Sequence, residues 1–137
     1  MNSAESFAAV CLAAVASDGV LGRDEARSLR IELEFRTPFS SMEDREMTEL
    51  FDRLLALWRD LGTMGLVKSA IPQLTPAQRE TALAVATQLV RADRVVEAEE
   101  LEFLNTLASS LDLNPGKAEL IIEVMDILHR DALDTSN

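Results

Sequence analysis

The sequence predicts an all-α protein, and three observations carry this prediction. Its 137 residues include five Gly, four Pro and no Tyr, while Ala, Leu and Glu are abundant, so strand-forming residues are scarce. Apolar residues recur at the three- and four-residue spacing of helices. Helix start and stop signals separate these stretches. The length and the 47% of hydrophobic residues are typical of one folded domain.

The first two expected helices cover about residues 3–17 and 23–36. The first is apolar on every side, as a helix buried among others would be, and it ends at the turn-forming pair Asp18-Gly19. The second begins after Gly22 and ends before Pro38, which disfavours helical geometry in the preceding residue. Its residues expected to face inward are Leu29, Ile31 and Leu33.

A long amphipathic helix is expected over about residues 40–62, followed by a short helix over residues 63–70. Gly62 separates the two, and Pro72 ends the short one. The apolar residues of the long helix share one side, which favours a role in the core. They are Met47, Leu50, Phe51, Leu54, Leu57, Trp58 and Leu61.

Three more helices are expected in the C-terminal half, giving about seven in all. Thr75 and Gln78 have the spacing of a capping box, and this fifth helix continues to about residue 92. A sixth helix covers about residues 98–111. Asn114-Pro115 then repeats the pattern of a cap followed by proline and opens a last helix that extends through Leu128.

The chain also contains an internal repeat, which a shift of 75 positions reveals without a gap. The shift aligns Asp18 with Asp93 and Glu25 with Glu100, and the repeat units cover about residues 4–36 and 79–111. Each unit consists of an apolar helix, an acidic turn, and an amphipathic helix with an acidic first turn. The repeat predicts a pseudo-symmetric bundle in which the two apolar, Ala-rich helices form the central pair.

A buried helix ending at Asp18-Gly19, a Glu seven residues after the Asp, and a second copy of this unit resemble the TerB-like tellurite-resistance family. The resemblance covers roughly residues 4–130. It implies a single TerB-like helical domain over residues 1–137, an acidic surface that binds metal ions, and a role in bacterial resistance to tellurite and related stress. It also implies membrane-associated protein partners.

Carried over position by position, the resemblance implies metal-binding roles for four acidic residues: Asp18, Glu25, Asp93 and Glu100. The second repeat departs from the family pattern, because Arg94 stands where the family usually has Gly and places a cation beside the implied site. Carboxylates are ligands for calcium, magnesium or manganese more than for zinc. One His and one Cys also argue against a zinc site of the usual kind.

The same acidic residues have a purely structural interpretation, which stays open beside the first. Asp18-Gly19 is an ordinary turn pair. Glu25 and Glu100 lie in the first turns of helices, where the helix dipole favours carboxylates. Cys11, in the most apolar helix, and His129, late in the last helix, are also interpreted as structural.

Charge and motif content limit the classes of function. With 13 Lys and Arg against 24 Asp and Glu, the net charge of -11 disfavours nucleic acid and favours cations or basic protein partners. No phosphate-binding loop, hydrolase elbow or metalloprotease motif occurs, so an enzyme is not expected. The apolar run over residues 7–16 is too short to span a membrane and lacks a basic leader. A cytoplasmic protein without direct membrane insertion is expected.

Two functions are compatible with these observations. The first is a non-enzymatic stress-response binding module that holds or senses a divalent cation through its acidic turns. The second is a metal-independent protein-interaction module that binds a basic partner through its acidic surface. The sequence does not predict an oligomeric state, nor whether the two acidic turns lie at one end of the bundle or at opposite ends.

Overall fold

The structure of the protein is a computed structural model, and it describes residues 1–92 and 96–135. Over this part of the chain it is all-α, as predicted, with six α-helices, two 3-10 helices and no strand. The elements are α1 (Ser3–Val15), α2 (Arg23–Glu34), η1 (Phe39–Ser41), α3 (Asp44–Ala70), η2 (Ile71–Gln73), α4 (Pro76–Arg91), α5 (Ala98–Ser110) and α6 (Lys117–Leu128). The two helices expected over residues 40–62 and 63–70 are both counted within α3, which changes direction at Gly62, and this explains the difference in number.

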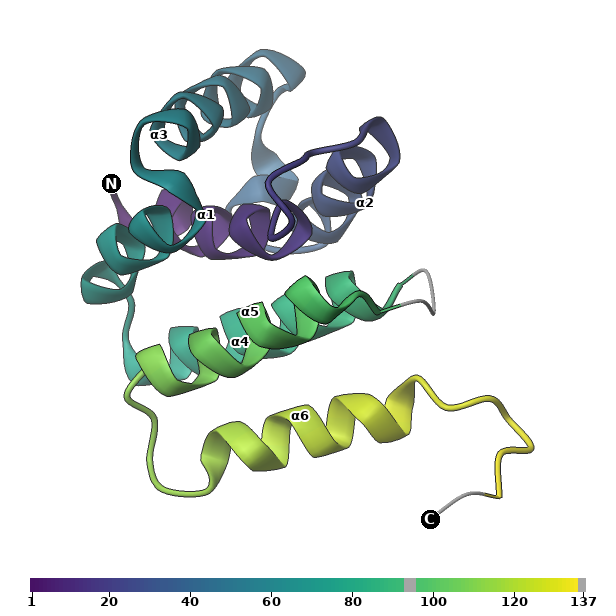
Figure 1. Ribbon diagram of the computed structural model, residues 1–137. Helices are drawn as coiled ribbons and strands as arrows, with labels where there is room; N and C mark the ends of the chain where they lie inside the picture. The colour runs from purple at the N-terminus through teal and green to yellow at the C-terminus, as the bar shows by residue number, and fades with distance from the viewer. Residues whose placement is uncertain (93–95, 136–137) are drawn as a thin grey trace.

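Helix α1 is the centre of the fold. In Figure 1 it lies between α2 and α3 on one side and α4 and α5 on the other, while α6 covers α4 from outside. All its residues from Ser6 to Val15 are buried. An apolar helix of this kind is stable only where other helices cover every side. The core therefore forms around α1, and α4 contributes buried residues from Ala82 to Val90.

Helices α1 and α4 pack against each other, as expected for the central pair, and run in the same direction (Figure 1). At their starting ends, the hydroxyl of Ser3 donates to the carbonyl oxygen of Gln73 at 3.0 Å. Because Ser3 opens α1 and Gln73 lies just before α4, both helices begin at one end of the bundle and finish at the other. The turn over residues 16–22, which follows α1, therefore lies at the end where α4 finishes.

The predicted break at Gly62 is present inside α3. Gly62 has φ 74° and ψ 174°, a conformation essentially restricted to glycine, and helix continues on both sides of it. The indole N–H of Trp58 donates to the Thr63 hydroxyl at 3.1 Å, and that hydroxyl donates to the Ala16 carbonyl at 3.4 Å. These bonds connect the kink to the end of α1.

Most of the apolar residues assigned to the core of α3 are covered, with one exception. Met47, Leu50 and Leu54 are buried, and Phe51, Leu57 and Trp58 pack partly buried against the core. The prediction that Leu61 lies in the core is wrong, because this residue is 44% exposed immediately before the kink. The change of direction at Gly62 comes directly after it.

Two other local expectations are wrong. Ile31 does not face inward beside the buried Leu29 and Leu33, because it is 47% exposed on the opposite side of α2. The last helix begins at Lys117 rather than at Asn114-Pro115. Gly116 adopts φ 82°, in the left-handed region, so the chain turns once more before the helix starts.

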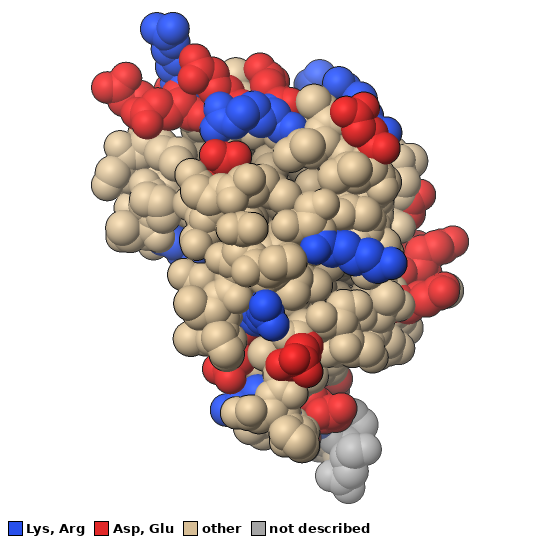
Figure 2. All heavy atoms as spheres, turned by 90° about the vertical axis from the view of Figure 1, so that its left-hand side faces the viewer, with Lys and Arg blue, Asp and Glu red and all other residues tan. Residues whose placement is uncertain are grey.

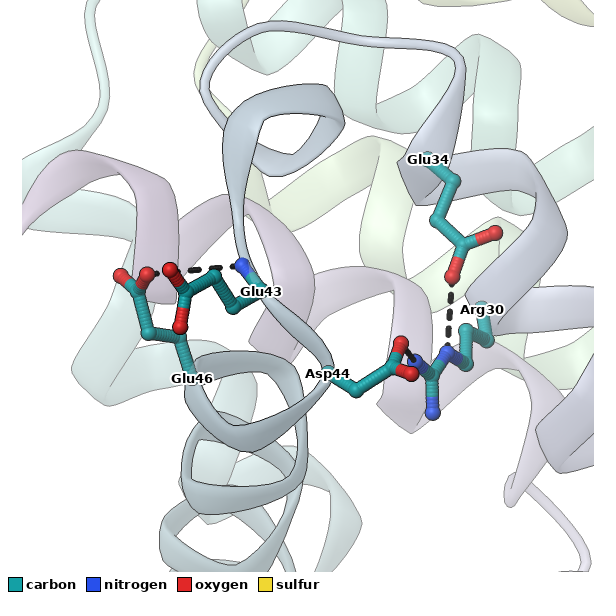
Figure 3. Close-up of polar contacts among 5 residues, drawn as sticks. All are labelled: Arg30, Glu34, Glu43, Asp44 and Glu46. Carbon is teal, nitrogen blue, oxygen red and sulfur yellow. Dashed lines mark hydrogen bonds and ion pairs between the residues drawn. The ribbon is translucent and has the colours of Figure 1, made fainter.

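The junction between α2 and α3 is held by charged side chains (Figure 3). Arg30 contacts Glu34 through Nε at 2.7 Å and Asp44 through Nη2 at 2.7 Å, which joins the end of α2 to the start of α3. The hydrogen bond to Glu34 is the main reason that the pKa of Arg30 is raised. At the same helix start, the Glu46 carboxylate accepts from the Glu43 backbone N–H at 3.4 Å. Acidic side chains at this helix start therefore have structural partners.

No helix in the described part of the chain has both the length and the apolar character needed to cross a membrane.

Candidate functional site

The first acidic turn is a compact loop between α1 and α2. Asp18 is exposed, and its Oδ1 accepts a hydrogen bond from the Val20 backbone N–H at 3.0 Å. Gly19 adopts φ 87°, and its N–H donates to the Ala16 carbonyl at 2.9 Å. The carboxylate thus stabilises the turn with one oxygen, while an ionised carboxylate has further lone pairs available for another donor or a cation.

Glu25 lies at the third position of α2 and is half-buried. Its side chain folds back over Gly22, because its Oε1 lies 3.0 Å from the place that a Cβ on Gly22 would occupy. A larger residue at this N-cap would require the carboxylate to move. The glycine therefore gives the Glu25 carboxylate room beside the helix start, where the helix dipole favours negative charge.

In the second unit, Asp93 and Arg94 lie outside the described residues, so the role assigned to Asp93 stays a prediction. Glu100 is described, half-buried at the third position of α5, and its Oε1 accepts from the Glu97 backbone N–H at 3.0 Å. The Glu97 side chain in turn accepts from the Glu100 backbone N–H, and the two contacts together form a capping box. Glu25 and Glu100 thus occupy corresponding places, and both lie back over the start of a helix.

The sequence left open whether the two acidic units lie at one end of the bundle or at opposite ends, and the parallel course of α1 and α4 bears on this point. The turn containing Asp18 and the start of α2 lie at the end of the bundle where α4 finishes and α5 begins (Figure 1). The acidic residues that the described structure gathers at this end are Asp18, Asp24, Glu25, Glu97, Glu99 and Glu100. Arg23, Arg27 and Arg91 lie at the same end, and Arg91 pairs with Asp126 at 2.8 Å.

The arrangement fits a cation only with additional ligands. Among the described residues, no three His, Cys, Asp or Glu side chains are grouped as a metal site would require. Calcium usually takes about 6–8 oxygen ligands. The predicted set of Asp18, Glu25 and Glu100 would therefore need backbone carbonyl oxygens, water or Asp93 to complete a coordination shell.

The opposite end of the molecule has a different surface. Figure 2 views the end at which α1 and α4 begin, where the middle of the face carries few charged side chains. Charged side chains gather at its upper edge, and others appear at the right-hand edge and toward the bottom. In Figure 1 the starts of α2 and α5 lie at the other end of the bundle.

The two residues interpreted as structural have environments that match that interpretation. Burial raises the pKa of the Cys11 thiol to about 12, which makes a thiolate nucleophile unfavourable. Nδ1 of His129 lies 2.8 Å from the Met125 carbonyl oxygen at the end of α6. This contact fits a histidine that stabilises a helix end.

Helix α6 carries a row of exposed apolar side chains that was not predicted from the sequence. Its members are Leu120, Val124, Ile127 and Leu128, each at least 50% exposed. Their spacing was visible in the sequence, but the same spacing is typical of a buried helix face. The exposure of these four residues depends on which side of α6 packs on α4. The packed side carries Ala118 and Met125, which are buried.

Comparison with known proteins gives one family. A family model described as tellurite resistance protein TerB matches residues 4–122. No curated protein matches the chain. No solved structure matches it either.

Proposed function

Because the chain belongs to the TerB family of tellurite resistance proteins, we propose that it is a non-enzymatic, cytoplasmic stress-response module that holds a divalent cation between its two acidic turns. The observation that supports this proposal is the parallel course of α1 and α4. It brings the Asp18 turn and the start of α5 to the same end of the bundle. Two sets of carboxylates can then contribute to one shared site.

The proposed ligands are Asp18, Glu25, Asp93 and Glu100, completed by carbonyl oxygens and water. Oxygen ligands of this kind suit calcium, magnesium or manganese. Carboxylates gathered at one end repel one another, and a bound cation relieves that repulsion. The ion would therefore stabilise the folded protein and join the two helical units.

Thermal unfolding of EDTA-treated protein tests the proposal, with calcium, magnesium, manganese and zinc added separately. The informative variant is Asp18→Asn, because its amide oxygen can still accept from the Val20 N–H while the charge is lost. Asp93→Asn tests the second unit, and Asp52→Asn, an exposed residue of α3, is the matched control. An ion at 100 times its dissociation constant should add about 2.7 kcal/mol.

We expect a stabilisation that is selective for one ion, absent in Asp18→Asn and Asp93→Asn, and intact in Asp52→Asn. An equal shift in all four proteins would indicate nonspecific screening of charge and would contradict the proposed site. The absence of any selective shift at millimolar ion concentrations would also contradict it.

A second candidate is a metal-independent protein-interaction module, and the exposed row on α6 favours it. Glu119 and Glu123 are exposed on the same helix. An apolar row flanked by acids is complementary to a basic amphipathic helix. Binding of a synthetic helical Leu/Lys peptide in EDTA, measured by calorimetry, should be weakened by Val124→Glu. Equal binding to this variant would contradict a docking role for α6.

A further inference from the structure

A pocket of about 520 Å³ lies at the end of the bundle opposite the Asp18 turn and the start of α5. Three segments form it: the start of α1, the chain between α2 and η1, and the first turns of α4. Its volume is within the range of pockets that bind small organic molecules. Ser3 and Ala77 place it beside the starts of the two central helices.

The lining of this pocket is largely apolar. Phe7 and Phe39 form a tilted aromatic pair with ring centroids 6.4 Å apart, and both line the pocket. Ala4, Pro38 and Ala77 add further apolar surface. An apolar or aromatic body would therefore be covered by rings and small side chains rather than by charged groups.

Arg36 is the one charged residue among the described residues that line the pocket. Its Nη2 contacts Glu32 Oε1 at 3.0 Å, while Glu32 Oε2 accepts a hydrogen bond from the Gln88 side-chain amide at 2.9 Å. A guanidinium has five N–H donors, so this contact leaves others available. The Nε of Arg36 is buried and has no hydrogen-bond partner in the described structure. The positive ends of the α1 and α4 dipoles add to the cationic character nearby.

We propose that this pocket binds a small carboxylate with an apolar or aromatic body. The carboxylate pairs with the Arg36 guanidinium, and the body lies against Phe7 and Phe39. Such a ligand matches both the charged and the apolar part of the lining. Arginine binds carboxylates through charge-assisted hydrogen bonds, and the aromatic rings contact an apolar group. Arg36 already pairs with Glu32, so selection for a carboxylate rests on its remaining N–H donors, including the unpartnered Nε.

Phenylacetate is a suitable probe, titrated into ¹⁵N-labelled full-length protein and followed by NMR. We expect saturable shifts confined to the starts of α1 and α4 and the chain over residues 36–39. Phenylacetamide has nearly the same shape without the charge and should bind at least about tenfold more weakly, as should acetate, which lacks the ring. Arg36→Gln should lose a similar factor for phenylacetate.

A second variant keeps the proposal testable if Arg36→Gln disturbs folding. Ala77 is exposed in the first turn of α4, so Ala77→Phe should fill the pocket without disturbing the core. Ala56→Phe, at an exposed position of α3, is the matched control and should bind normally. Equal affinity for phenylacetate and phenylacetamide, shifts outside the pocket, or unchanged binding by Ala77→Phe would each overturn the proposal.

Discussion

Replacing Arg79 with methionine should destabilise the protein, because this side chain holds three segments together. Its guanidinium donates to three backbone carbonyl oxygens through Nε, Nη1 and Nη2. These belong to Leu74 at 3.1 Å, Leu111 at 3.1 Å and Ile71 at 3.0 Å. One arginine of α4 thereby fixes both ends of η2 and the C-cap of α5. Methionine keeps most of the apolar stem but donates to none of these oxygens.

The expected loss is about 3 kcal/mol in the free energy of unfolding. A hydrogen bond from a charged group contributes about 1.5–3 kcal/mol when it is well buried. Arg79 is only half-buried, so water can replace part of each bond in the variant and the simple sum is too large. Arg79→Lys should recover little, because an ammonium lacks the planar fork that reaches three oxygens.

Urea unfolding followed by far-UV circular dichroism measures this loss by linear extrapolation. Arg45→Met is the matched control, because the Arg45 side chain is 87% exposed and makes one ion pair, with Glu49 at 3.2 Å. That change should cost less than about 0.5 kcal/mol. If Arg79→Met cost less than about 1 kcal/mol, the claim that Arg79 holds the three segments would be refuted.

Three further predictions concern single positions. Gly62→Ala should cost about 1–3 kcal/mol in urea unfolding, because φ is 74° there although no atom obstructs a Cβ; an unchanged midpoint would contradict this. Thr75→Ala should cost about 1 kcal/mol by thermal unfolding, because the Thr75 hydroxyl caps the Gln78 N–H; an unaltered melting temperature would argue against the cap. Cys11 should resist a thiol reagent until urea unfolds the chain, and rapid labelling of folded protein would contradict its burial. Because its folded pKa is raised from 9.0 to about 12, the stability of wild type relative to Cys11→Ala should be full below pH 9 and decline as the pH rises toward 12.

The helices and their ends were determined largely by the sequence itself. The cap formed by Thr75 and Gln78 depends on residues three apart, and the break at Gly62 depends on one residue's freedom at positive φ. The apolar character of α1 required burial on every side wherever the helix was placed. Such features depend on contacts within about one turn of helix, so local sequence is sufficient to predict them.

The tertiary structure alone decided where these elements face and what they bring together. The sequence could not determine that α1 and α4 run parallel, which brings the Asp18 turn and the start of α5 to one end. Nor could it distinguish the exposed Ile31 and Val124 from core residues, or join Arg36 to Phe7 around a pocket. These outcomes depend on contacts between residues far apart in the chain, and a helical apolar pattern has the same spacing whether or not another helix covers it.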